Sequence, residues 1–91
     1  RRSSDLVRLP IPPLTTDRRK ELVKQVRKLL EDAKISLRNL RREARSKLEK
    51  ADGLPEDEVK RALDRIDKET DKYIKDTDEI AAQKEKEIME F

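Results

Sequence analysis

From Leu22 to Ala51 the apolar side chains recur with an eleven-residue period, and this spacing constrains the fold more than any other feature. Successive apolar positions are separated by 4, 3, 4, 4, 3, 4, 4 and 3 residues: Leu22, Val26, Leu29, Ala33, Leu37, Leu40, Ala44, Leu48 and Ala51. Eleven residues in three turns correspond to about 3.67 residues per turn, which keeps the stripe on one face of a nearly straight helix. We expect these positions to form the core stripe of one long helix.

Both ends of this helix carry recognisable signals. Thr15 or Thr16 is suited to cap its first turn, because a threonine hydroxyl accepts a hydrogen bond from an unpaired backbone N–H. Gly53, the only glycine of the chain, is expected to end the helix, and Pro55 to begin the next one. The segment between these two helices is therefore short.

A second helix is predicted by apolar or small side chains spaced mainly by four and three residues: Val59, Leu63, Ile66, Thr70, Tyr73, Thr77, Ile80, Ile88 and Phe91. We expect helices at about 16–51 and 55–90. A short turn makes them antiparallel neighbours, each about 50 Å long. Val23, Leu30 and Ile74 would flank the stripes and stay uncovered, so a third helix from elsewhere in a longer chain, or a second copy, is expected to cover them.

The fold class is thus all-α: a long antiparallel helical hairpin, representing two helices of a three-helix bundle. Residues 1–14 differ from the rest, because Pro10, Pro12 and Pro13 exclude a helix and favour an extended linker or hinge. "LVRLPI" within it could be a strand, but nothing else in the chain offers it a partner. Residues 15–91 form the helical bundle domain, and we expect the chain to be a segment of a longer protein.

Composition excludes several function classes. The chain has no cysteine and no histidine, so it lacks thiolate ligands, disulfides and the commonest general base. We expect no metal, no cofactor and no enzymatic activity. No apolar run approaches the roughly 18 residues of a membrane span. These features are typical of a soluble intracellular protein.

Charge is distributed unevenly. Residues 1–50 hold 16 Lys and Arg against 7 Asp and Glu, whereas residues 51–91 hold 8 against 14. Either the first half binds an anionic partner, or the two helices attract each other.

The positions that follow stripe residues 26, 33, 37, 40 and 44 are all cationic: Arg27, Lys34, Arg38, Arg41 and Arg45. Like charges aligned in this way are slightly unfavourable for the helix, and arginine grips phosphate with a planar fork. Both points favour an elongated polyanion such as nucleic acid. A solvated face, or bridging from these side chains to acidic residues of the second helix, is the alternative.

Three segments carry a resemblance to a known family: "LPIPPLTTDRRKELVKQVRK", "AKISLRNLRREARSKLEK" and "KEKEIMEF". Together they resemble the C-terminal half of ribosome recycling factor. Members of that family combine a three-helix bundle with a β-rich domain inserted after its first helix. The resemblance implies that residues 1–14 are the second hinge and a remnant of the inserted domain, and that the first helix has no counterpart here.

The resemblance also implies a function after translation termination, in which the helical arm binds ribosomal RNA of the large subunit and acts with elongation factor G to split the ribosome. By motif it assigns RNA contact to Arg38 and Arg41, with Arg42 alongside, and to Arg18 and Arg19 at the hinge end. Arg45 and Lys34 extend the same row. The cytoplasm of a bacterium, or the stroma or matrix of an organelle, is the expected location. A purely structural coiled-coil segment without RNA binding is the alternative function.

Overall fold

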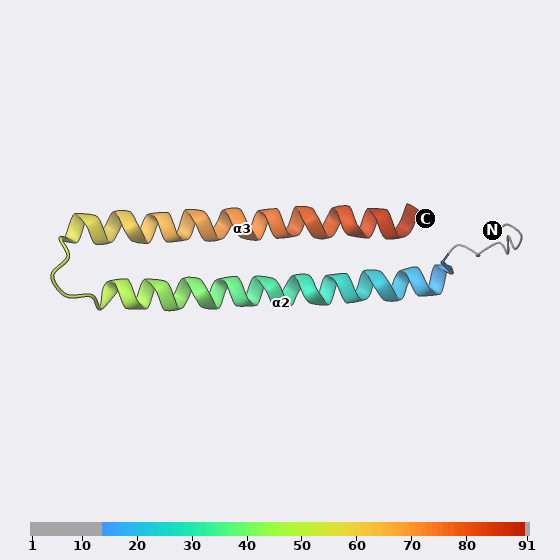
Figure 1. The fold of residues 1–91 in the computed structure, drawn as a ribbon, viewed down its shortest axis with the longest axis horizontal. Helices are drawn as coiled ribbons and strands as arrows, with labels where there is room; N and C mark the ends of the chain where they lie inside the picture. Colours follow the sequence, from blue (N-terminus) through green and yellow to red (C-terminus); the bar gives the residue numbers. More distant parts are fainter. Residues whose placement is uncertain (1–13, 91) are drawn as a thin grey trace, which may run out of the picture.

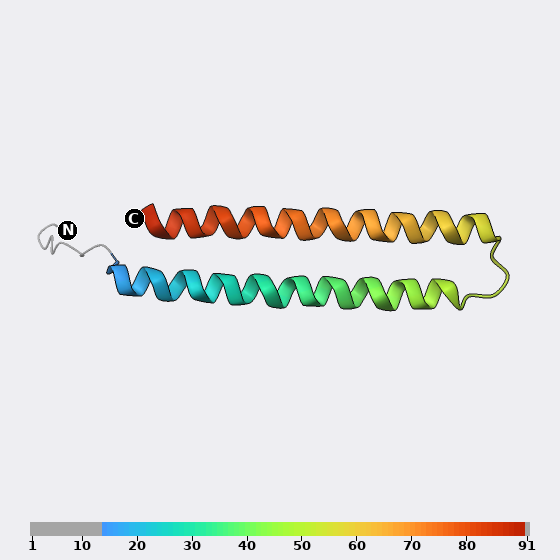
Figure 2. The ribbon, with the colours of Figure 1, turned by 180° about the vertical axis from the view of Figure 1, so that it is seen from behind.

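The computed structural model describes residues 14–90, which form two long helices joined by a short turn (Figure 1). Helix α2 spans Thr16–Glu49 and helix α3 spans Glu56–Glu90. Views from the front and from behind show them side by side and antiparallel, with the start of α2 and the end of α3 at the same end (Figures 1 and 2). Residues 14–90 contain no strand. The predicted all-α helical hairpin is therefore confirmed for this part of the chain.

Of the linker predicted for residues 1–14, the structure describes only the last residue, Leu14. Its hinge prolines, Pro10, Pro12 and Pro13, lie outside the described residues, and so does Phe91. None of the helices within residues 14–90 is both long and apolar enough to cross a membrane.

The helix ends follow from local chemistry. Of the two candidate caps, Thr15 is the one used: its hydroxyl accepts a hydrogen bond from the backbone N–H of Arg18 at 3.0 Å. In the turn, Gly53 has φ +81°, a left-handed conformation that costs a glycine little. The carbonyl of Pro55 then accepts from the N–H groups of Glu58 and Val59, both at 3.1 Å, and α3 begins.

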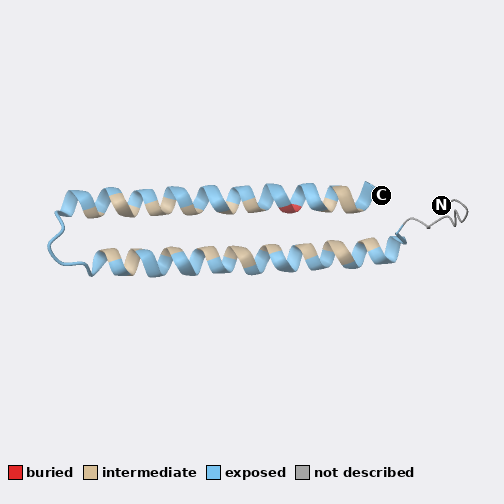
Figure 3. Cartoon of the chain, in the orientation of Figure 1, coloured by how far each residue is buried: buried red, intermediate tan, exposed pale blue. Residues whose placement is uncertain are grey.

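The interface between α2 and α3 is thin. Among the described residues only Ala81 is buried, and half-buried residues line the facing sides of both helices (Figure 3). The half-buried apolar residues are, on α2, Leu22, Val23, Val26, Leu30, Ala33, Leu37 and Leu48, and on α3, Val59, Ala62, Leu63, Ile66, Ile74 and Ile88.

The position of α3 on α2 differs from the prediction. Leu29 and Leu40, expected in the core stripe, are 67 % and 61 % exposed. Val23 and Leu30, expected to stay uncovered, are half-buried instead, as is Ile74 on α3. The apolar sector of α2 is wider than one helix can cover, and α3 lies over one side of it.

Candidate nucleic-acid interface

The hairpin has two long edges of opposite character. Two residues along an α-helix correspond to a rotation of about 200°, so Arg38 and Leu40 lie on opposite sides of α2. The same relation separates Asp71 from Tyr73 on α3. We call one side the apolar edge; its large exposed side chains are Leu29, Leu40, Tyr73 and Ile80.

On the other side four ion pairs connect the helices. Their nitrogen–oxygen distances lie between 2.7 and 3.3 Å, in the pairs Arg27–Glu85, Lys34–Asp78, Arg41–Asp71 and Arg45–Asp67. We call these pairs, together with Arg38 and Arg42, the ionic edge. Steps of 7, 7 and 4 residues along α2 match equal steps back along α3. The pairs therefore follow a single antiparallel register over much of the hairpin.

Lys34 is the most enclosed cation of this edge, with 17 % of its side chain exposed. Its Nζ lies 3.1 Å from Asp78 Oδ1 and 3.2 Å from Glu31 Oε2. The hydrogen bond to Asp78, followed by the one to Glu31, raises the pKa of Lys34 above its ordinary value. This lysine stays charged, but it is already ion-paired with both neighbouring carboxylates.

Arg38 and Arg42 differ from the cations that pair with α3. Both are exposed and lie one helical turn apart on α2. Arg42 donates a hydrogen bond to the side-chain oxygen of Asn39 at 3.1 Å, a neutral partner. Within residues 14–90, neither arginine forms an ion pair with a carboxylate. Their guanidinium groups can therefore bind an external anion without breaking an ion pair of this part of the chain.

Arg18 and Arg19, predicted as a further basic pair, lie at the end of the hairpin where α2 begins. Arg18 pairs with Glu21 at 3.0 Å on the same helix. Arg19 donates to the carbonyl oxygens of Leu14 at 3.2 Å and Met89 at 2.7 Å. Carbonyl groups in the last turn of a helix lack partners within the helix, so Arg19 stabilises the end of α3 and fixes it to the start of α2.

The structure places the seven predicted RNA-binding residues in three groups. Arg38 and Arg42 are open, Arg18 and Arg19 are engaged at the helix ends, and the other three pair with α3: Lys34, Arg41 and Arg45. Sequence reasoning raised bridging to the second helix as an alternative but did not name the four acidic partners. Their spacing, which mirrors that of the cations, is the signal that could have found them.

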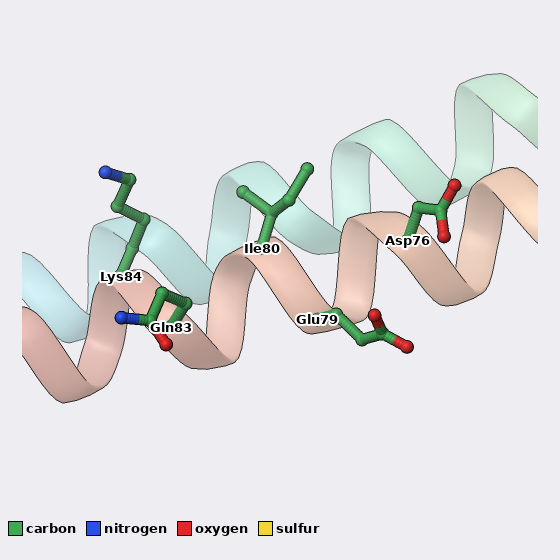
Figure 4. Close-up of a pocket in the computed structure, with 5 residues that line it drawn as sticks. All are labelled: Asp76, Glu79, Ile80, Gln83 and Lys84. Atoms are coloured by element: carbon green, nitrogen blue, oxygen red, sulfur yellow. The ribbon is translucent and has the colours of Figure 1, made fainter.

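Possible metal ligands do not cluster in the described part of the chain. Residues 14–90 contain no group of three or more side chains placed to hold a metal ion. Figure 4 shows a shallow hollow on α3 lined by Asp76, Glu79, Ile80, Gln83 and Lys84. Acidic, basic and apolar groups are mixed there, and they leave the helix in different directions. This arrangement does not favour any one class of ligand.

The fold and this surface define a class: a rod-like helical module with the ionic edge on one side and the uncovered apolar edge on the other. The model of the ribosome recycling factor family matches residues 1–89. Curated ribosome-recycling factors are similar over nearly the whole chain. The protein from a Hydrogenobaculum species is 48 % identical over 90 residues, which are 99 % of this chain and 50 % of that protein. The protein from Symbiobacterium thermophilum is 53 % identical over 88 residues, 93 % of this chain and 48 % of that protein.

The chain belongs to the ribosome recycling factor family. It spans about half the length of the curated relatives that it matches. A search of solved structures found no significant match.

Proposed function

We propose that this chain is the part of a ribosome recycling factor that binds ribosomal RNA of the large subunit, through the ionic edge. Family membership supports action on the ribosome after termination. In this proposal elongation factor G is the partner that hydrolyses GTP, the chain itself performs no catalysis, and the process takes place in the cytoplasm of a bacterium or in an organelle.

The observation that carries the proposal is the pair Arg38 and Arg42. They are exposed, one turn apart, and not ion-paired within residues 14–90. Guanidinium groups bind phosphate with two parallel hydrogen bonds, so this pair is suited to two phosphates of an RNA backbone. Arg41, half-buried between them and α3, extends the same positive surface.

Co-sedimentation with purified bacterial large ribosomal subunits tests this proposal. We expect Arg38→Ala/Arg42→Ala to weaken binding by about 1.5–3 kcal/mol for each charged hydrogen bond that the substitutions remove. The matched control is Arg61→Ala/Arg65→Ala, which removes the same charge from exposed positions of α3. Equal weakening in both variants would mean that net charge, and not this edge, determines binding.

The apolar edge supports a second part of the proposal. Two shallow hollows, which include Leu29 and Ile80 in one and Leu40 and Tyr73 in the other, run along it. We propose that the first helix of a longer protein covers this edge; self-association is the alternative. In sedimentation of this chain alone, self-association predicts a concentration-dependent mass that Leu29→Ser/Leu40→Ser abolishes, whereas a monomer at all concentrations would exclude it.

The four ion pairs between α2 and α3 favour a different function, a structural segment without RNA binding. In that case the cations serve the fold alone. The same co-sedimentation separates the two functions, because a structural segment would not bind large subunits in any variant.

A further inference from the structure

Two carboxylates of the ionic edge are open to solvent beside the proposed RNA contacts. Asp71, paired with Arg41 at 3.3 Å, has 72 % of its side chain exposed, and Asp67, paired with Arg45 at 2.7 Å, has 43 % exposed. The two arginines are more enclosed, at 29 % and 33 %. A phosphate approaching either arginine along this edge would therefore meet a carboxylate at the surface.

We propose that Asp71 and Asp67 limit the affinity of the ionic edge for RNA, by competing with phosphates for the guanidinium groups of Arg41 and Arg45. This inference rests on the proposed function and adds the residues that moderate it. A guanidinium has five N–H donors, and these two ion pairs use only some of them, so a phosphate has donors available. The carboxylate repels that phosphate and shares the positive charge, which weakens the contact.

Arg41 or Arg45 can exchange its carboxylate partner for a phosphate without unfolding of the hairpin. Ion pairs between exposed or half-exposed groups contribute little to stability, because water and salt screen them. The apolar contacts of the interface remain when such a pair opens. Lys34 is less suited to exchange, since it contacts both Asp78 and Glu31. The competition is therefore concentrated at Arg41 and Arg45, next to Arg38 and Arg42.

The test measures the affinity of the full chain for purified bacterial large ribosomal subunits at fixed salt. Asp71→Asn and Asp67→Asn keep the side-chain shape and remove one negative charge each. The matched control is Glu79→Gln, which removes one negative charge from the side of α3 that faces away from α2, two residues from buried Ala81 (Figure 4). Circular dichroism melts are recorded for every variant.

We expect each aspartate variant to bind about threefold to tenfold more tightly than the native chain, and the double variant more tightly still. Glu79→Gln should differ by less than about twofold, because screening limits distant charges. Affinities of Asp71→Asn and Asp67→Asn equal to that of Glu79→Gln would overturn the inference, and weaker binding would overturn it by showing that the carboxylates position the arginines. Each pair is tested separately, so one poorly folded variant leaves the other decisive. Absence of binding by the native chain would instead overturn the proposed function, and this inference with it.

Discussion

The two edges of the hairpin are formed by the same two helices, yet they differ in how well their side chains are partnered. Along the apolar edge, large side chains such as Leu40 and Ile80 stay more than half exposed. Along the ionic edge, the four cations of α2 that reach α3 each form an ion pair with an acidic side chain. One edge is thus deficient in contacts and the other is rich in them.

This difference separates stability from recognition. Covering apolar surface contributes about 25 cal/mol per Å², so a helix lying on the apolar edge would stabilise the fold considerably. Exposed ion pairs contribute about 0–1 kcal/mol each. The ionic edge therefore presents positive charge, and its residues can be changed with little loss of stability.

The largest effect is expected at the interface itself. Ala81→Asp places an ionised carboxylate at the one buried position of residues 14–90, beside the apolar side chains of Val26 and Leu30, where it loses hydration. We expect a decrease of roughly 3 kcal/mol in the free energy of unfolding, measured by urea denaturation. Ala82→Asp, one residue along and exposed, is the control and should unfold nearly as the native chain does. Similar decreases in both variants would indicate a helix-propensity effect.

A smaller effect is expected when one ion pair is removed. Arg45→Met deletes the shortest pair, that with Asp67 at 2.7 Å, and keeps most of the apolar side-chain volume. We expect the free energy of unfolding to fall by at most about 1 kcal/mol at low salt and by less at high salt. Thermal melts at two salt concentrations measure it. A decrease comparable to that of Ala81→Asp would contradict the separation, because the ionic edge would then hold the fold together.

The smallest effect concerns the charge of Lys34. Its pKa is raised in the folded chain, mainly by the hydrogen bond to Asp78 and then by the one to Glu31. The resulting stability is fully present below the ordinary lysine pKa and disappears as the pH rises through the raised value. The difference in melting temperature between the native chain and Lys34→Met should therefore be larger at a pH of about 8 than at about 11.5. A difference that does not change with pH would mean that Lys34 contributes by packing alone.

Periodicity and turn chemistry were sufficient to predict the hairpin. The eleven-residue repeat predicts one long helix, and Gly53 and Pro55 place the reversal, because these signals are local. The side of α2 on which α3 lies could not be predicted in the same way. Leu29 and Leu30 are both apolar, and the choice between them depends on contacts with residues far away in the sequence.

For the candidate site, the sequence predicted where the arginines lie on α2 but not which residues of α3 they pair with. The position of Arg38 just beyond the apolar stripe predicted a cation beside the buried face, because helix geometry alone determines which face a residue occupies. The pairing of Arg41 with Asp71 depends on the register across the turn. A shift of one helical turn would give Arg41 a different partner, and a single helix pattern does not fix that register.

The central claim is that the open arginines of the ionic edge contact phosphates, and the salt dependence of binding tests it most directly. The affinity for purified large ribosomal subunits is measured over a series of salt concentrations, for the native chain and for Arg38→Ala/Arg42→Ala. Each phosphate contact contributes about 0.7–0.9 to the slope of log affinity against log salt. We expect the double variant to bind more weakly, with a slope smaller by about 1.4–1.8 and an unchanged circular dichroism spectrum. The same affinity and the same slope in both chains would contradict the claim.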